Sequence, residues 1–368
     1  MHVHLLVPDL LRRNLLAPDQ KRLAVPADNA AAPAVPSALQ LLGRGRHRGA
    51  ATSLYDWLAD RHGLQPVQLT AATSLLGDGG APGGDTWLRA DPVQLTVDRD
   101  SLVLADASTF SITADEAAAL AQAINAHFAP VLQFDLRTPL HWYARLGDEL
   151  KSAAALRWTP LHRARGQAVR GNLPQGDNAM RWNALANEVQ MLLHSHPVNA
   201  AREARGDPLI NSLWFWGAGP LATPGSRAFG QVYADDPVAR GLTLAAGGSA
   251  APLPPDARAW LQQAANTGQV LFVLDALSPP ADYADHEQWL EQAARLERDW
   301  FAPLLAALRS ERIGMLTLAL PGNTTDDDVA THTQGIETEV VSGDLRRFWR
   351  RVRPLRRYLM AAKDASHD

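Results

Sequence analysis

Polar side chains that suit ligand binding are concentrated between His194 and Gly219. Imidazole, amide and guanidinium groups supply directional hydrogen bonds, so they favour a ligand-binding role in addition to a structural one. His194 and His196 also form a His-x-His pair, which could hold a metal ion if both residues lay on one strand. The candidate anion-binding residues are His196, Asn199, Arg202 and Asn211.

A helix, a turn and a buried strand must position these side chains. Apolar residues recur at helical spacing over about 180–193, which predicts a helix that ends at the histidine pair. A histidine at a helix end often caps carbonyl groups or packs, and this is the alternative to a metal role. Trp214 and Trp216 predict a buried strand, and the glycines that follow predict a tight loop.

An acidic residue follows the first apolar run of the chain. Val3–Val7 predicts a buried strand, and Asp9 comes two residues after it. Ligands of open α/β sheets bind at the carboxyl ends of strands, so Asp9 is a candidate site residue. The alternative is a loop carboxylate that caps the turn at Leu10–Leu11.

Strands and helices alternate in the second half of the chain. Short apolar runs predict buried parallel strands at 241–245, 270–274 and 313–320, and a long amphipathic helix is expected at 285–308. This alternation predicts an α/β fold with a doubly wound, mostly parallel sheet.

The middle of the chain has a different pattern. After the glycine-rich stretch 77–85, two strands are expected at 87–95 and 102–104. Thr113 and Glu116 form a capping box, which predicts that an amphipathic helix begins there. The glycine-rich stretch lacks the Lys-Ser/Thr ending of a phosphate-binding P-loop, so we expect it to form a turn.

The composition narrows the class of protein. The chain has 368 residues, of which 46% are hydrophobic and 20% charged, and this length predicts roughly two domains. A formal charge of −4 argues against broad nucleic-acid binding. The absence of cysteine excludes disulfides, thiolate nucleophiles and cysteine-ligated metals, and it fits a reducing cytoplasm. With no basic leader and no long apolar run, we expect a cytoplasmic protein without a membrane span.

The stretch around the histidine pair resembles a known family. It is similar to a stretch of the archaeal-type cofactor-independent phosphoglycerate mutases, which belong to the alkaline phosphatase superfamily. The shared residues, in order between 196 and 219, are His-Pro-Val-Asn, Arg, Gly, Pro, Asn and Gly-Ala-Gly. Gly84–Asp91, the helix start at Thr113 and the region 272–303 resemble further segments of that family in the same order. The chain is identified as a degenerate bacterial relative of these enzymes.

The resemblance implies a phosphatase-like α/β core at 1–84 and 181–368, into which a smaller α+β domain at 85–180 is inserted. It also implies a reaction that needs two divalent metal ions, usually manganese, and a serine that carries the phosphoryl group. Paired cations lower the pKa of such a serine and neutralise the charge of the phosphate in transfer. The Asp and His ligands of these ions are therefore diagnostic of activity.

Only some of these ligands have counterparts here. Asp9 matches the first-strand aspartate of the family, and Ser53 is the candidate nucleophile, although the family pattern around it is absent. Asp282 and His286 reproduce an Asp-x-x-x-His motif, a spacing that would place both side chains on one face of a helical turn. His332 could supply a final ligand. The alternative is that Asp282 caps the following helix and His286 lies on its exposed first turn.

Two departures weaken the expected chemistry. The Asp-His pair that should follow the late strand is replaced by Ala319–Asn323, and Trp216 stands where the family has a phosphate-binding arginine. Loss of one cation removes much of the charge stabilisation of phosphoryl transfer, so turnover should fall by orders of magnitude. We therefore expect a catalytically impaired pseudoenzyme with a regulatory or metabolite-binding role and no cofactor. The resemblance implies that its old cleft, around His196, Asn199, Arg202 and Asn211, holds a small anion or a phosphorylated metabolite. The alternative is an active phosphoglycerate mutase or phosphatase with a rearranged manganese or zinc site.

The segment Arg346–Arg357 carries the densest charge in the chain. It could form an amphipathic helix whose arginines reach solvent while its apolar residues dock on the protein. It could also bind nucleic acid, an acidic protein or anionic lipid, which makes an interaction protein the third hypothesis. The apolar residues in question are Phe348, Trp349, Val352 and Leu355.

Overall fold

The structure is a computed structural model. It describes residues 1–16, 32–51, 53–98, 101–264, 268–322, 335–347 and 349–364, together with the side chains of these residues other than Arg13 and 360–364. His332 and Phe348 lie outside the described residues. Of the helices in these ranges, none combines the length and the apolar character that a bilayer span requires.

The chain divides into two compact units. Unit 1 comprises Met1–Pro66 and Pro224–Asp368, and unit 2 is the continuous segment Val67–Thr223. The insertion expected at 85–180 lies within unit 2, which begins earlier and ends later than that prediction. The unit ends later because the strand predicted at Trp214–Trp216 pairs with the strand that begins at Trp87, and so belongs to unit 2.

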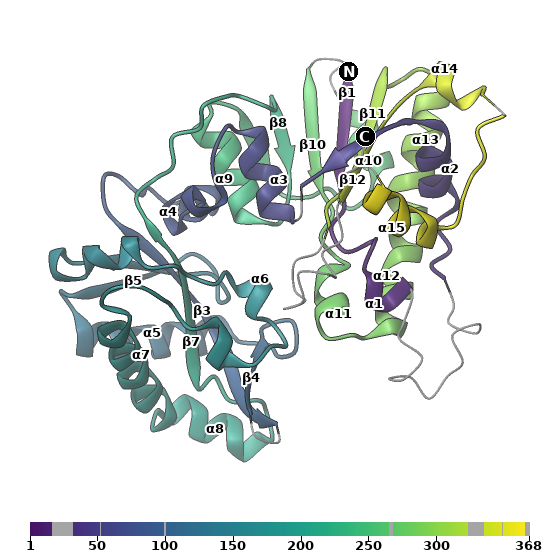
Figure 1. The fold of residues 1–368 in the computed structure, drawn as a ribbon. Coiled ribbons are helices and arrows are strands. Elements are labelled where there is room, and N and C mark those ends of the chain that lie inside the picture. Colours follow the sequence, from purple (N-terminus) through teal and green to yellow (C-terminus); the bar gives the residue numbers. More distant parts are fainter. Residues whose placement is uncertain are drawn as a thin grey trace. The chain divides into compact units, whose positions relative to one another are not determined.

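Unit 1 is built on a seven-stranded sheet in the order β2-β12-β11-β1-β10-β8-β9 (Figure 1). Five neighbouring strands are parallel, whereas β12 and β2 add to one side by antiparallel pairing. The predicted fold class, an α/β fold with a mostly parallel central sheet, is therefore confirmed. The strands are β1 (His2–Leu6), β2 (Arg46–Ala50), β8 (Gln231–Tyr233), β9 (Ser249–Ala251), β10 (Gln269–Val273), β11 (Met315–Leu320) and β12 (Gly335–Val341).

The two faces of this sheet differ in polarity. Val3, Leu5 and Phe272 lie on the apolar face, within a core that includes residues of the helices packed on it. Those helices are α2 (Pro36–Arg44), α10 (Ala257–Gln263), α12 (His286–Leu296), α13 (Ala302–Arg309) and α15 (Leu355–Asp364). Hydrophobic burial on this side is the main force that holds unit 1 together.

The opposite face carries polar side chains at alternate positions. His2 hydrogen-bonds Thr317 Oγ1 at 2.7 Å and stacks on His4, with 3.8 Å between ring centroids. Trp57 of α3 (Leu54–Arg61) packs over this side, where its indole donates to Glu337 Oε2 at 3.0 Å. Glu337 and His4 are buried, so this face holds buried polar side chains beside apolar ones such as Leu271.

Two segments of unit 1 differ from expectation. The apolar run 241–245 is the end of helix α9 (Pro237–Ala245), because Asp236 caps that helix with a side-chain bond to Ala239 N and Pro237 starts it. A short apolar run is compatible with strand or helix, so periodicity alone was misleading. The helix expected at 285–308 contains a π-helical segment, Glu297–Phe301, where Ala302 N bonds to Glu297 O.

Unit 2 is an antiparallel sheet packed against helices. Strand β3 is its centre and pairs with β4, β6 and β7. The predicted capping box is confirmed, since Thr113 and Glu116 exchange hydrogen bonds at the start of α5 (Ala114–Phe128). The strands are β3 (Trp87–Asp98), β4 (Ser101–Asp106), β5 (Leu132–Leu136), β6 (Trp142–Leu146) and β7 (Ser212–Gly219). The longest remaining α-helices in the described part of unit 2 are α4 (Ala71–Gly77), α7 (Ala179–His194) and α8 (Pro197–Arg205).

Candidate functional site

The candidate site lies at the carboxyl ends of the parallel strands of unit 1. The chain leaves β1 and reaches Asp9, whose backbone has a φ of 60°, in the left-handed region that non-glycine residues rarely adopt. The indole of Trp289 donates a hydrogen bond to the Asp9 carbonyl at 3.0 Å, which fixes this unusual turn. Asp9 therefore stands where ligands of open α/β sheets bind.

A buried ion cluster surrounds the Asp9 side chain. Arg12 Nη1 donates to Asp9 Oδ1 at 2.9 Å, and Arg12 Nη2 lies 3.3 Å from Asp282 Oδ1. The hydroxyl of Ser278 donates to the other Asp9 oxygen at 2.7 Å. The side chains of Asp9, Arg12 and Asp282 are only 14%, 7% and 6% exposed. One guanidinium thus joins the two carboxylates that the sequence nominated as metal ligands.

Sequence reasoning did not identify Arg12 or Ser278 as members of the site. Both carried a weak signal, because Arg12 follows Asp9 by three residues in a turn, and Ser278 precedes Asp282 by four. These short spacings bring side chains together only if the local backbone turns, and a single sequence does not specify that.

The residues present do not fit the divalent ions that the resemblance implies. Such ions are held by several carboxylate or imidazole ligands, and Asp9 already directs both oxygens to Arg12 and Ser278. Across the described ranges, no group of three or more His, Cys, Asp or Glu side chains is placed to hold a metal ion. A guanidinium between the two carboxylates also repels a second cation from the same space.

The other residues expected at a metal or nucleophile site are placed as follows. Asp282 is the last residue of α11 (Ser278–Asp282) and His286 is the first of α12, so the two lie on different helices rather than on one helical face. Asp285, not Asp282, caps α12 by accepting a bond from Gln288 N at 3.0 Å. Ser53 caps α3, and its hydroxyl accepts a bond from Asp56 N at 3.1 Å.

The four candidate anion-binding residues lie in unit 2 and bond to its own backbone or side chains. His196 caps α8 through a bond from Val198 N to its Nδ1, and burial lowers the pKa of its imidazole. The Asn199 amide donates to Leu193 O at 2.8 Å and to Ile210 O at 2.9 Å. His194 ends α7 and is exposed, so the His-x-His pair spans two helices rather than one strand.

The side chains of Arg202 and Asn211 also form their hydrogen bonds within unit 2. Arg202 uses Nε, Nη1 and Nη2 to bond Pro208 O, the Glu116 carboxylate and Ser111 O, at 2.7, 2.9 and 2.9 Å. Asn211 exchanges two hydrogen bonds with the Leu95 backbone. These contacts fasten α8 and the start of β7 to the rest of unit 2.

A second buried charge cluster lies in the sheet of unit 2. Arg89 Nε donates to Asp91 Oδ1 at 2.8 Å, and the Trp216 indole donates to the other oxygen at 2.6 Å. Trp216 faces Arg89 across the β3–β7 pair, with the guanidinium carbon 5.8 Å from its ring centroid. The tryptophan that replaces an expected arginine therefore belongs to the interior of the sheet.

The same cluster extends to a buried carboxylate. Burial raises the pKa of the Tyr143 phenol, which stays protonated and donates to Asp78 Oδ2 at 2.6 Å. Burial alone would raise the pKa of Asp78, but hydrogen bonding to His141 and Tyr143 lowers it instead. The charged side chains of this cluster thus have their hydrogen-bond partners within unit 2.

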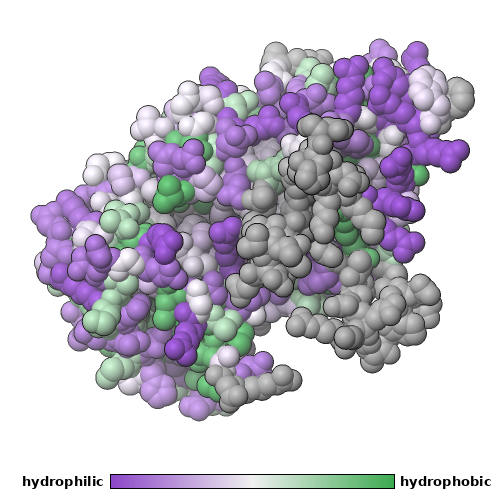
Figure 2. Space-filling view, viewed as in Figure 1, coloured by the Kyte–Doolittle hydropathy of each residue, from purple (hydrophilic) through white to green (hydrophobic). Residues whose placement is uncertain are grey.

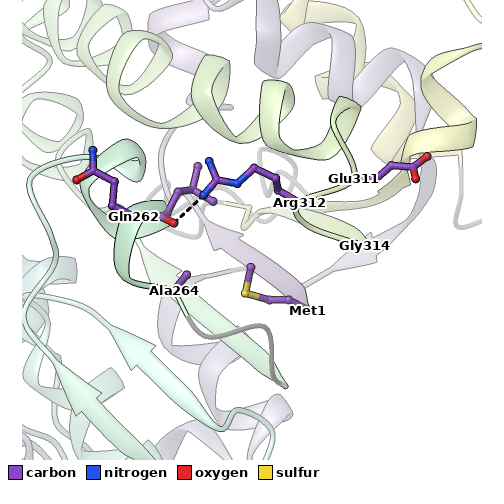
Figure 3. A pocket seen from close by; sticks show the side chains of 7 residues that line it. Met1, Gln262, Ala264, Glu311, Arg312 and Gly314 are labelled. Atoms are coloured by element: carbon purple, nitrogen blue, oxygen red, sulfur yellow. Dashed lines mark hydrogen bonds between the residues drawn. The ribbon is translucent and has the colours of Figure 1, made fainter.

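A cavity of about 470 Å³ opens at the amino ends of β1 and β11, the opposite edge from Asp9 (Figure 3). Gln262, Glu311 and Arg312 are among its lining residues. Arg312 Nη2 already donates to the backbone carbonyl of Leu261 at 2.8 Å. The cavity therefore does not contain the candidate residues at the carboxyl edge.

Comparison with known proteins finds similarity to one family over part of the chain. Residues 83–199 match the model of the family described as 2,3-bisphosphoglycerate-independent phosphoglycerate mutase. A probable 2,3-bisphosphoglycerate-independent phosphoglycerate mutase of Geobacter sulfurreducens is 30% identical over 166 residues. That match covers 45% of this chain and 40% of the relative, so the chain spans less than half of the relative's length. The resemblance found in the sequence is confirmed.

Among the solved structures that match, one with a TM-score above 0.5 has a similar fold. The PH0037 protein from Pyrococcus horikoshii has a TM-score of 0.54 at 12% identity, and the match covers 92% of this chain and 87% of that protein. The cofactor-independent phosphoglycerate mutase from Thermoplasma acidophilum has a TM-score of 0.42 at 16% identity, over 93% of this chain and 90% of that one.

Proposed function

Because residues 83–199 match the cofactor-independent phosphoglycerate mutase family, we propose that the chain is a phosphoglycerate-mutase-like protein that has lost catalysis and serves a regulatory or metabolite-binding role. The matched segment lies within unit 2, whereas Asp9, Ser53 and Asp282 lie in unit 1. The family model thus matches a part of the chain that does not contain the expected metal ligands. A cytoplasmic location accords with the lack of cysteine.

The observation that carries the proposal is the position of Arg12. Phosphoryl transfer of the expected kind needs divalent metal ions bound beside the nucleophile and the phosphate. Here the two carboxylates that were candidate metal ligands, Asp9 and Asp282, both pair with the guanidinium of Arg12, a cation that is part of the chain itself. A guanidinium has no vacant coordination position, so it cannot lower the pKa of a bound hydroxyl as a metal does.

The cluster around Arg89 supports the same conclusion. Its guanidinium bonds Asp91, Ser74 and Tyr143 inside unit 2, and its side chain is 6% exposed. An arginine held in this way has no free face for the phosphate of a substrate. Two basic residues that could assist phosphate chemistry are therefore used inside the fold.

A direct assay tests the proposal. Purified protein is loaded with manganese, zinc or no added metal, and interconversion of 2- and 3-phosphoglycerate is measured together with metal content by elemental analysis. We expect no stoichiometric metal and no turnover above a protein-free control. Turnover with bound metal would instead establish the alternative, an active mutase or phosphatase with a rearranged ligand set.

A phosphorylated small molecule remains the ligand class we propose for a binding role. The candidate anion-binding residues stay a prediction; they are His196, Asn199, Arg202 and Asn211. Binding of an anion by these side chains would compete with the hydrogen bonds described above. Calorimetric titration with 3-phosphoglycerate and inorganic phosphate measures it. Binding that is abolished by Arg202→Lys, while the fold is retained, would assign the anion site to these residues.

A second candidate function rests on the arginine-rich C-terminal segment. The segment is not one amphipathic helix, because α14 (Ser342–Leu345) ends before it and α15 begins only after Pro354. Leu355 is buried as predicted, but Trp349 and Val352 are 65% and 46% exposed, contrary to the docking prediction. Hydrophilic residues dominate the surface of unit 1 around α14 (Figure 2).

This segment lies beside another basic element of unit 1. Arg350 Nη1 donates to Arg44 O at 2.6 Å and to Gly45 O at 2.9 Å, which holds the segment next to the exposed strand β2. Together they form an arginine surface that suits an acidic protein partner. Its exposed arginines are Arg46, Arg48, Arg346, Arg351, Arg353, Arg356 and Arg357.

Affinity capture tests the arginine surface. Full-length protein is compared with the quadruple variant Arg351→Glu, Arg353→Glu, Arg356→Glu and Arg357→Glu as bait, and retained proteins are identified by mass spectrometry. We expect acidic partners to be lost from the variant and to leave the parent at high salt. An identical set of partners on both baits would exclude this function.

A further inference from the structure

We propose that the exposed edge of β2 is a docking site for an extended, acidic segment of a partner protein, which adds to the seven-stranded sheet of unit 1 as a further strand. This inference rests on the arginine surface proposed above as an interaction site. It adds the conformation of the partner segment and the backbone groups that bind it.

Strand β2 has an open side. It is the last strand at one end of the sheet, and it pairs with β12 in the antiparallel direction from Arg46 to Ala50. In the ranges that the structure describes, no strand pairs with its other side, and residues 46–49 are exposed. Alternate residues of an antiparallel strand turn their N–H and C=O groups away from the neighbouring strand. The edge therefore presents a row of hydrogen-bond donors and acceptors that a further strand can use.

The side chains of β2 select the charge of that strand. Arg46 and Arg48 lie on one face of the sheet and His47 on the other, because side chains alternate along a strand. Arg48 is 52% exposed, although it forms ion pairs with two glutamates of β12. Like charges directly opposite each other destabilise a strand pair. The arginines therefore disfavour a basic strand or a second copy of β2, and they favour a strand with carboxylates at the facing positions.

The C-terminal arginine segment adds positive charge beside the same edge. Arg350 Nη1 donates to the carbonyl oxygens of Arg44 and Gly45, the two residues before β2. A Cβ at Gly43 would lie only 2.9 Å from Val352 Cα, so the segment passes closely along the chain that leads into β2. Its exposed arginines are Arg346, Arg351, Arg353, Arg356 and Arg357. Charge complementarity therefore favours a partner segment that is acidic along its length.

Charge attraction and strand addition are distinguishable by experiment. Attraction between charges needs no particular backbone conformation and is screened by salt. Strand addition requires free N–H groups on the partner, and it protects from exchange the N–H groups of β2 that it engages. A peptide that keeps its charge but loses its N–H groups therefore separates the two contributions.

The test uses the full chain and a peptide of about eight residues in which glutamate alternates with valine, so that the carboxylates lie on one face of a strand. The control peptide has the same sequence with a methyl group on every backbone nitrogen, which preserves its charge and removes its donors. Calorimetric titration at low salt measures both affinities. We expect the unmethylated peptide to bind at least about tenfold more tightly, because several backbone hydrogen bonds form only with it. Hydrogen exchange should also slow at alternate backbone N–H groups of Arg46–Ala50.

A charge reversal at the edge itself makes the result specific. Arg46→Glu should weaken binding of the unmethylated peptide by about five- to tenfold at low salt. The matched control is Arg258→Glu, which makes the same change of charge at an exposed arginine of α10 and should change the affinity by less than about twofold. Thermal unfolding verifies that both variants are folded, and the comparison of the two peptides on the parent protein does not depend on any variant.

The outcomes separate this inference from the proposed interaction function. Preference for the unmethylated peptide, together with protection of β2, supports strand addition. Equal affinity of the two peptides overturns it, while the arginine surface stays a site for acidic proteins. Binding of neither peptide overturns it too, and the affinity capture described above then decides the interaction function separately. Vesicles that contain phosphatidylserine are titrated as well, and binding of these vesicles without binding of the peptide would overturn the inference in favour of a membrane surface.

Discussion

Asn199 is a residue whose type suits a ligand, although its hydrogen bonds run inside the fold. Its amide donates to Leu193 O and Ile210 O, and its carbonyl oxygen accepts from Ile210 N at 2.9 Å. The side chain is 3% exposed. Residue type and spacing made it a candidate for anion binding, whereas its hydrogen bonds hold together the junction of α7, α8 and β7.

Substitution of Asn199 tests this structural role. Asn199→Ala removes three buried hydrogen bonds, to Leu193 O, Ile210 O and Ile210 N, so we expect the free energy of unfolding to fall by about 2–4 kcal/mol. Chemical denaturation followed by tryptophan fluorescence measures it. The control is Asn172→Ala, which removes one solvent-exposed bond to Ala168 O and should change stability by less than about 0.5 kcal/mol. Equal effects of the two substitutions would contradict the assignment.

His4 gives unit 1 a predictable response to acid. Burial lowers the pKa of His4 from 6.5 to about 3, helped by the nearby His2 and Arg61. Between these values the unfolded chain binds a proton that the folded chain does not, so stability decreases as the pH falls. The contribution of His4 between pH 7 and pH 5 is about 2 kcal/mol, given about 1.4 kcal/mol per pH unit below its unfolded pKa.

The variant His4→Leu removes this term. Its free energy of unfolding should decrease less than that of the parent over the same pH interval, by about 1–2 kcal/mol. Urea denaturation at closely spaced pH values gives the two slopes. Parallel slopes for variant and parent would show that His4 carries no proton-linked stability.

At the scale of elements, β7 approaches α4 so closely that a glycine is needed. Gly217 has a φ of 69°, and a Cβ at this position would lie 3.3 Å from Ala71 N. Gly217→Ala should therefore cost about 1–2 kcal/mol of stability through backbone strain. Gly171→Ala is the matched control, because a Cβ there meets nothing within 4 Å. Equilibrium unfolding of both variants decides the point, and a neutral Gly217→Ala would refute it.

Element types were largely predictable from the sequence, whereas their partners were not. The Thr113–Glu116 capping box is local, so it fixed the start of α5. Trp214 and Trp216 predicted a strand correctly, but nothing in an apolar run states which sheet it joins. The π-helical segment before α13 depends on one shifted backbone bond, from Ala302 N to Glu297 O, which periodicity does not reveal.

The candidate site, like the elements, could be predicted from the sequence only in part. Asp9 and Asp282 could be nominated from strand position and from the resemblance, and the structure brings them to one cluster. The cation between them is Arg12, and its position depends on a left-handed turn at Asp9 that the sequence does not predict. Ser53 and His286 have other local roles, as helix-capping and helix-starting residues.

At the scale of the molecule, each unit has a hydrophobic core of its own. The core of unit 1 draws on residues from both ends of the chain, whereas the main core of unit 2 lies between Leu88 and Ala218. A continuous segment with its own core should fold alone. We therefore expect the fragment 67–223 to unfold cooperatively, with coincident transitions by near-UV circular dichroism and fluorescence.

The boundaries of that fragment are themselves a sharp test. The shorter fragment 85–180 matches the insertion expected from the sequence but lacks β7, which pairs with β3 from Ser212 to Gly219. It also lacks most of α7, whose Val189 and Leu193 are fully buried in the core of unit 2. Exposed strand edges and an incomplete core should leave it loosely packed, with dye-accessible apolar surface and no near-UV signal. A well-folded 85–180 fragment would show that β7 is peripheral and that the family insertion ends where the sequence alone had placed it.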